Sequence, residues 1–212
     1  MSTRCTAYAS STLTNRASQV AGLIVMGTSL DYENERLVKS GSWDARSVMP
    51  PMIETFSKPV ESTFELPDEF CGALVDNGFG KECTPETREL WVANLKKNYR
   101  GDAGRKRLRQ AAINLLERDG LHQRLPDIKC PVLWLQGEAD AVFSVETANE
   151  EIKLFTSSPD AHVIPVKGGQ HYLSWSNPEE VDSALLEFIG KHQKGEKPDA
   201  RALREAVGMV DI

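Results

Sequence analysis

At residues 131–140 the chain reads PVLWLQGEAD, a short apolar run followed by a turn that ends in Asp140. A continuous apolar run of this length, bounded by a proline and a glycine, is typical of a parallel strand that is buried on both faces. The stretch therefore predicts a strand at about 131–136, with an acidic side chain just beyond its carboxyl end.

Two further runs have the same character. Residues 161–166 read AHVIPV and lead into a glycine pair and then His171, and residues 20–26 read VAGLIVM and end in a Gly-Thr-Ser turn. The carboxyl ends of parallel strands meet at one edge of a sheet. We therefore expect Asp140 and His171 to lie side by side at that edge.

Helical signals dominate the rest of the chain. Between Asp31 and Asp127 strand signals nearly vanish, and helices are expected at about 42–56, 67–77, 85–99 and 102–118. The consecutive prolines at 50 and 51 predict a break in the first of these. After the 131–136 strand, a helix is expected at about 145–155, and a last one begins at Asn177-Pro178, a cap followed by a proline in the first turn.

Taken together, these segments resemble the α/β-hydrolase superfamily. Residues 127–140 are similar to its strand and acid loop, residues 168–189 to its histidine loop and closing helix, and residues 20–29 to the strand after its nucleophile helix. The resemblance implies an α/β protein with a truncated α/β-hydrolase fold: about three parallel strands, flanking helices and an inserted helical cap. The implied domains are a partial core at 1–30 and 128–193, a cap at 31–127 and a C-terminal tail at 194–212.

The resemblance also assigns roles to the two edge residues. His171 would be the general base that takes a proton from a serine, and Asp140 would fix the imidazole tautomer and stabilise the imidazolium. Glu138 and Glu146 remain alternatives for the acid. The other three histidines are expected to be structural or on the surface: His122, His162 and His192.

A nucleophile is not identifiable in the sequence. The family presents its serine in a Gly-x-Ser-x-Gly turn one helix upstream of the strand at 20–26, and no such motif occurs. Counting back one helix reaches Ser2, which lacks both glycines of the motif. Ser29 and Ser174 have no such context either and are expected to be turn residues.

Two functions follow from these observations. The first is descent from an esterase-like serine hydrolase that acts on a small apolar acyl substrate, with a place in a metabolite biosynthetic pathway. The second is a catalytically inactive, truncated hydrolase-like protein that serves as a binding module or has no function. We expect the chain alone not to turn over esters. A helical interaction protein built on residues 31–127 is the weakest alternative, because that block reads as an insert in a sheet domain.

The composition of the chain limits the classes of binding partner that are expected. A net charge of −6 and a pI near 5.3 give no reason to expect nucleic-acid binding. The four cysteines show no metal-binding spacing, and no cofactor motif is present. No apolar run is long enough to span a bilayer, so no membrane partner and a cytoplasmic location are expected. The strand at 20–26 would have an open outer edge, which predicts self-association.

Overall fold

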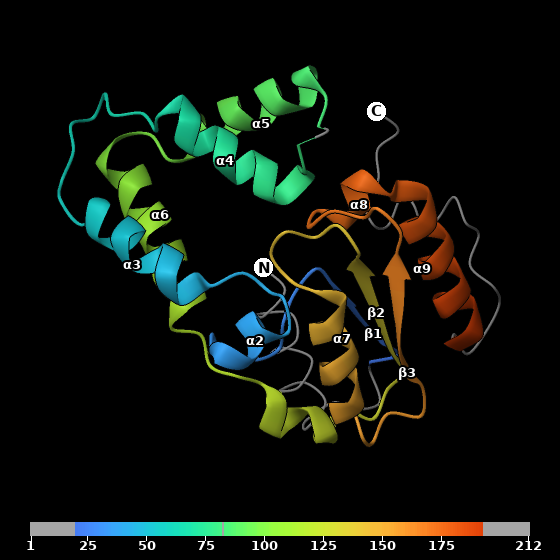
Figure 1. Cartoon of the computed structure of the whole chain (residues 1–212). Coiled ribbons are helices and arrows are strands. Elements are labelled where there is room, and N and C mark those ends of the chain that lie inside the picture. The colour runs from blue at the N-terminus through green and yellow to red at the C-terminus, as the bar shows by residue number, and fades with distance from the viewer. Residues whose placement is uncertain (1–19, 82, 193–212) are drawn as a thin grey trace.

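The protein is built around a small parallel sheet. The computed structural model describes residues 20–81 and 83–192 (Figure 1). Strands β1 (Leu23–Met26), β2 (Val132–Gly137) and β3 (Ala161–Val166) form one sheet in the order β1-β2-β3, with both pairs parallel. The predicted three-stranded parallel sheet is thus confirmed, with β2 in the middle.

The strand bounds follow from simple chemistry. Pro131 has no N–H to donate, so β2 begins one residue later, while its carbonyl accepts from the N–H of Leu23 at 2.9 Å and opens the β1 ladder there. Residues 20–22, which the apolar pattern placed in the strand, precede that first ladder bond.

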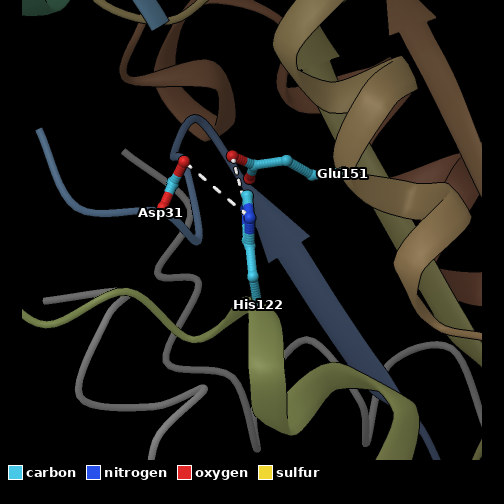
Figure 2. Close-up of side chains that lie close together, drawn as sticks. All are labelled: Asp31, His122 and Glu151. Atoms are coloured by element: carbon cyan, nitrogen blue, oxygen red, sulfur yellow. Dashed lines mark hydrogen bonds and ion pairs between the residues drawn. The ribbon is translucent and has the colours of Figure 1, made fainter. Parts of the chain in front are cut away.

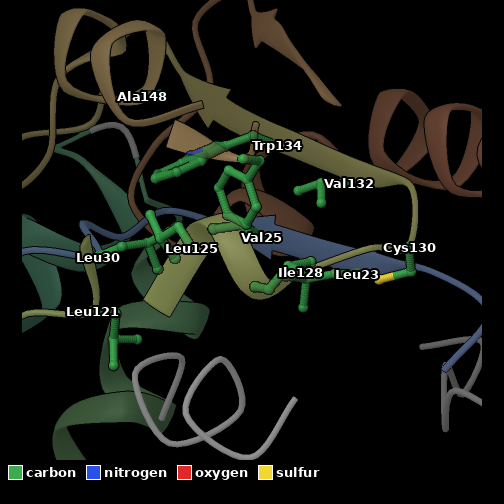
Figure 3. Close-up of a cluster of buried hydrophobic side chains, with 11 residues drawn as sticks. Leu23, Val25, Leu30, Leu121, Leu125, Ile128, Cys130, Val132, Trp134 and Ala148 are labelled. Atoms are coloured by element: carbon green, nitrogen blue, oxygen red, sulfur yellow. The ribbon is translucent and has the colours of Figure 1, made fainter. Parts of the chain in front are cut away.

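The central strand is buried along its whole length, because helices cover both faces of the sheet. On one face Trp134 belongs to an apolar cluster (Figure 3) with residues of α7 (Val145–Glu151), of η2 (His122–Asp127) and of the segment after η3 (Ile152–Leu154). On the other face Leu133 and Leu135 pack against α8 (Leu173–Ser176) and α9 (Pro178–His192). Alternate residues of β2 thus serve opposite faces.

Helices fill the long interval between β1 and β2: α2 (Glu35–Lys39), α3 (Ala45–Thr55), α4 (Asp68–Phe79), α5 (Pro85–Asn98) and α6 (Gly101–Leu116). In Figure 1, α3 to α6 form a group to one side of the sheet, whereas α2 lies beside α7. Within the group α3 packs on α6 and α4 on α5. The division into a core, a cap at 31–127 and a tail stays a prediction, and the tail at 194–212 lies outside the described residues.

The expected break at Pro50-Pro51 does not occur, since α3 runs through both prolines. Each proline removes a helical N–H, which leaves the carbonyls of Arg46 and Ser47 without their usual donors. Both of these residues are exposed, so water can satisfy the freed carbonyls. Among the helices of the described residues, none is long and apolar enough to cross a membrane.

Candidate functional site

The structure brings Asp140 and His171 together. Each follows a strand, β2 for the acid and β3 for the histidine, and the two strands are neighbours. Nδ1 of His171 lies 3.2 Å from Oδ2 of Asp140. The carboxylate side chain is fully buried, while the imidazole is 23% exposed. One partner is therefore shielded from water and the other is open to a reactant.

Asp140 is held by several donors. Its Oδ1 accepts from the backbone N–H groups of Val142 at 2.7 Å and Phe143 at 3.1 Å, and its Oδ2 accepts from Nε2 of Gln136 at 2.8 Å. These hydrogen bonds fix the orientation of the carboxylate. One sequence signal points to Gln136, since it is a polar residue at the end of an otherwise apolar strand.

Close backbone approach brings the strand ends together. A Cβ on Gly137 would overlap the carbonyl of Gly169, and a Cβ on Gly27 would lie 2.7 Å from the carbonyl oxygen of His171. The N–H of Ala139 donates to the Gly169 carbonyl at 2.9 Å, which ties the acid loop to the histidine loop. Positions 27 and 137 therefore suit only glycine, because any larger residue would push the two loops apart.

The imidazole of His171 has two aromatic neighbours. Its centroid is 5.9 Å from that of Phe143 and 5.5 Å from that of Tyr172. If Nδ1 carries the proton that faces Asp140, Nε2 is left as an acceptor, which is the state a general base requires. Within residues 20–81 and 83–192, the hydrogen bond of this ring is the one with Asp140.

The alternative acids lie elsewhere. Glu138 and Glu146 are both exposed, and neither is a hydrogen-bond partner of His171. Ser29 is buried and donates from Oγ to Glu151 at 2.8 Å, so it holds the turn after β1. Ser174 is an exposed residue of α8, and Ser2 lies outside the described residues.

Two of the remaining histidines, His162 and His192, contact the same acidic residue. His162 Nδ1 lies 2.9 Å and His192 Nε2 lies 3.0 Å from the carboxylate of Asp160, which also accepts from Nζ of Lys191 at 2.8 Å. This group joins the start of β3 to the end of α9, which is a structural position. The hydrogen bond from Lys191, followed by those from the two histidines, outweighs partial burial and lowers the pKa of Asp160 to about 2.

No local pattern predicts the second charged group, in which the buried acids Asp31 and Glu151 meet the partly exposed side chains of Arg36 and His122. Figure 2 shows His122 between the two acids, with Nε2 at 3.2 Å from Glu151 and Nδ1 at 3.8 Å from Asp31. Burial opposes ionisation of Asp31, but hydrogen bonds from Asn34 and Arg36 outweigh it and lower its pKa.

The same cluster has atoms of metal-ligand type, since those of Asp31, His122 and Glu151 lie within 4.8 Å of one another. However, Nη2 of Arg36 is 2.9 Å from Asp31 and 2.8 Å from Glu151. A metal ion would have to compete with this guanidinium for both carboxylates. The donor set therefore favours a structural ion-pair cluster over a metal site.

Beside His171 four aromatic side chains form what we call the aromatic face: Phe79, Trp91, Tyr172 and Trp175. Phe79 is buried and its ring centroid lies 4.8 Å from Tyr172, 5.1 Å from Trp91 and 5.7 Å from Trp175. The other three are 37 to 47% exposed. The face therefore presents apolar surface directly beside the imidazole.

Comparison with known proteins gives a partial match in sequence. No family model matches the chain. Over 80 residues it is 30% identical to a pimeloyl-[acyl-carrier protein] methyl ester esterase from Xanthomonas oryzae pv. oryzae, a stretch that covers 38% of this chain and 30% of that protein. The corresponding protein of Xanthomonas axonopodis pv. citri is 29% identical over the same length.

Solved structures match over most of the chain. A hydrolase from Oleispira antarctica has a TM-score of 0.65 at 16% identity, covering 85% of this chain and 60% of that one. An esterase from Exiguobacterium antarcticum has a TM-score of 0.64 at 18% identity, with 85% and 62% covered. A thermophilic esterase from Thermogutta terrifontis has a TM-score of 0.56 at 20% identity, with 87% and 61% covered. These likenesses confirm the expected fold, and the chain spans about three fifths of the length of these structures.

Proposed function

We propose that this chain, which has the α/β-hydrolase fold, carries the acid and the general base of a serine ester hydrolase. In this proposal Asp140 is the acid, His171 is the base, and the serine lies outside residues 20–81 and 83–192. The observation that carries the proposal is the 3.2 Å contact between Nδ1 of His171 and the fully buried carboxylate of Asp140.

The chemistry follows from this geometry. With Nδ1 donating to Asp140, Nε2 of His171 accepts the serine proton as the hydroxyl oxygen attacks the ester carbonyl. The same nitrogen then returns the proton to the leaving alcohol. Asp140 is held in place by its backbone and Gln136 donors, and it stabilises the imidazolium while the positive charge lasts.

A small apolar acyl group is the substrate class that the surroundings favour. The aromatic face offers partly exposed rings beside His171, against which an acyl chain or an apolar alcohol can pack. The names of several relatives, which are esterases, support an ester as the reacting bond. A place for this chain in a metabolite biosynthetic pathway is part of the same proposal.

A second candidate is a hydrolase-like binding module without turnover. It is favoured by one observation: within residues 20–81 and 83–192, the hydrogen-bond partner that the structure gives the imidazole of His171 is the carboxylate of Asp140. In that case the aromatic face would still bind apolar acyl compounds, but the imidazole would have no hydroxyl to activate.

Active-site labelling separates the two functions. We would tag the C-terminus at the chromosomal locus and recover the protein from its own cells, which keeps any additional segment or partner. The preparation is then treated with a fluorophosphonate probe and assayed with p-nitrophenyl butyrate. We expect a labelled serine outside residues 20–81 and 83–192, and a loss of labelling of at least about 10³-fold in His171→Gln and Asp140→Asn.

The control is His162→Gln, which removes a histidine from the far end of β3 and should label normally. A labelled serine within the described residues would contradict the proposed source of the nucleophile. Absence of both label and turnover, with other serine hydrolases of the same cells labelled, would reject the enzyme in favour of the binding module.

A further inference from the structure

The loop that carries His171 is attached to the end of helix α4. The backbone N–H of Tyr172, the residue after the histidine, donates to the carbonyl of Gly78 at 2.8 Å. Gly78 lies in the last turn of α4, whose C-terminal residue is Phe79. Two segments far apart in the sequence thus share a backbone hydrogen bond next to the imidazole.

The space beside Gly78 is filled by the Tyr172 side chain. A Cβ built on Gly78 would overlap Cδ2 and Cε2 of the tyrosine ring and lie 3.1 Å from Cζ. In a helix, glycine is ordinarily less favourable than alanine because it loses more backbone freedom on folding. Here the contact with the ring requires it, since no larger residue leaves room for Tyr172.

Gly80 packs against Gln170, the residue before His171. Its φ is +78°, a left-handed backbone that favours glycine, and a Cβ at this position would lie 2.6 Å from Cδ of Gln170. The N–H of Gln170 is in turn bound to Oγ of Ser176 at 3.0 Å. Both neighbours of His171 are therefore packed against glycines that flank a single residue of the α4 end.

Phe79, the residue between those glycines, anchors the contact. It is 6% exposed and its ring meets Tyr172 and Trp175 from the histidine loop side and Trp91 from α5. The segment 78–80 therefore cannot move without disturbing the loop, and the loop cannot move without disturbing α4 and α5.

We propose that the segment Gly78–Gly80 is a positioning element for His171, which couples the placement of helices α4 and α5 to the geometry of the Asp140–His171 pair. A displacement of α4 would pull Gln170 and Tyr172 with it and change the Nδ1–Oδ2 contact. The functional meaning of this coupling rests on the proposed role of His171 as a base, but the coupling itself is a property of the fold.

Histidine NMR tests the coupling without any need for turnover. The chain has four histidines, and the ¹H, ¹³C and ¹⁵N signals of the His171 ring can be assigned by their loss in His171→Gln. In Gly78→Ala we expect the His171 ring signals to shift and the Nδ1-protonated tautomer to decrease, while the signals of His162 and His192 stay in place.

Two companion variants make the result specific. Gly190→Ala is the matched control, because Gly190 lies in α9 and nothing lies within 4 Å of an added Cβ. In a Tyr172→Ala background, Gly78→Ala should no longer move His171, because the ring that the Cβ displaces is gone. An unchanged His171 in Gly78→Ala, or an equal shift with and without Tyr172, would overturn the proposal.

If Gly78→Ala fails to fold, all four histidines will show unfolded positions, and Phe79→Leu replaces it. That variant keeps both glycines and removes the ring contacts, so a shift confined to His171 is again expected, and no shift would reject the coupling. A shift in the absence of any labelled serine would reject the enzyme but keep the positioning element. Normal labelling with no shift of the His171 signals would reject the positioning element but keep the enzyme.

Discussion

Gln136 lies directly beneath Asp140, and its Nε2 donates both to Oδ2 of that carboxylate and to the carbonyl of Phe143, each at 2.8 Å. The amide is fully buried at the end of β2. Since the same Asp140 oxygen faces His171, the glutamine helps to orient the carboxylate, together with the N–H groups of Val142 and Phe143. A residue in the strand thereby contributes to the orientation of the pair in the loops above it.

Replacing Gln136 by leucine should therefore destabilise the protein. The substitution leaves the Phe143 carbonyl and one carboxylate oxygen buried without this donor, and each such loss costs about 1–3 kcal/mol. We expect a lower urea midpoint and a change in the His171 ring signals. Gln136→Glu should cost more, because it adds a second carboxylate next to Asp140. An unchanged midpoint in Gln136→Leu would show that the amide is dispensable.

Glu151 should be far more important to stability than its neighbour Glu150. Glu151 is fully buried and accepts from Ser29 Oγ and from the N–H of Leu30 at 2.6 Å, besides its ion pair with Arg36. Glu151→Leu leaves the Ser29 hydroxyl and the Leu30 N–H without their acceptor and removes one of the three acidic partners of Arg36. Each buried donor left unsatisfied costs about 1–3 kcal/mol, so a clear loss is expected in urea unfolding. Glu150→Leu removes a half-exposed partner of the same Arg36 and should cost about 1 kcal/mol or less. Equal losses would contradict the cluster's structural role.

Acid should weaken the link between β3 and α9. The folded protein holds the pKa of Asp160 at about 2, mainly through Lys191, whereas the unfolded chain has the ordinary value near 4. A depressed folded pKa contributes stability above about pH 4, and this contribution is lost as the pH falls from about 4 to 2. The difference in urea midpoint between the wild type and Asp160→Asn should therefore be present at pH 6 and shrink toward pH 2.

The control for this titration is Glu89→Gln, which removes an exposed acid from α5. Its difference from the wild type should stay near zero at every pH. A difference for Asp160→Asn that persists at pH 2 would mean that the carboxylate charge is not the source of its contribution.

The outer edge of β1 predicts self-association. In the described part of the chain β1 pairs with β2 alone, and since Leu23 and Gly27 donate toward β2, the backbone groups of Ile24 and Met26 face the other way. We expect concentration-dependent dimers or larger species in sedimentation velocity, and a shift toward monomer in Met26→Lys, because a charge on an edge strand opposes pairing.

Val38→Lys provides the comparison, since Val38 is 39% exposed but lies on α2. It should leave the sedimentation profile unchanged. A wild-type chain that stays monomeric at all concentrations would contradict the prediction.

The sheet and the pairing of Asp140 with His171 could be predicted because both depend on local patterns. An apolar run bounded by proline or glycine marks each strand, and parallel topology alone brings neighbouring carboxyl ends together. Glu151 could not be predicted, because its partner Ser29 is 122 residues away and both lie in stretches of ordinary polarity. Gly78 was equally hidden, since its role depends on a tyrosine ring that packs against it only in the folded chain.

The close approach of Gly27, Gly137 and Gly169 allows selection for folding to be distinguished from selection for activity. These positions tolerate no side chain whether or not the protein reacts with anything, because the backbones meet there. His171 has no such steric requirement, and its partly exposed ring could be replaced without emptying the interior. A deep mutational scan scored for folding would therefore leave the three glycines fixed and position 171 free to drift. If a scan scored for growth also allows only histidine at position 171, the requirement comes from the activity of the protein and not from its folding.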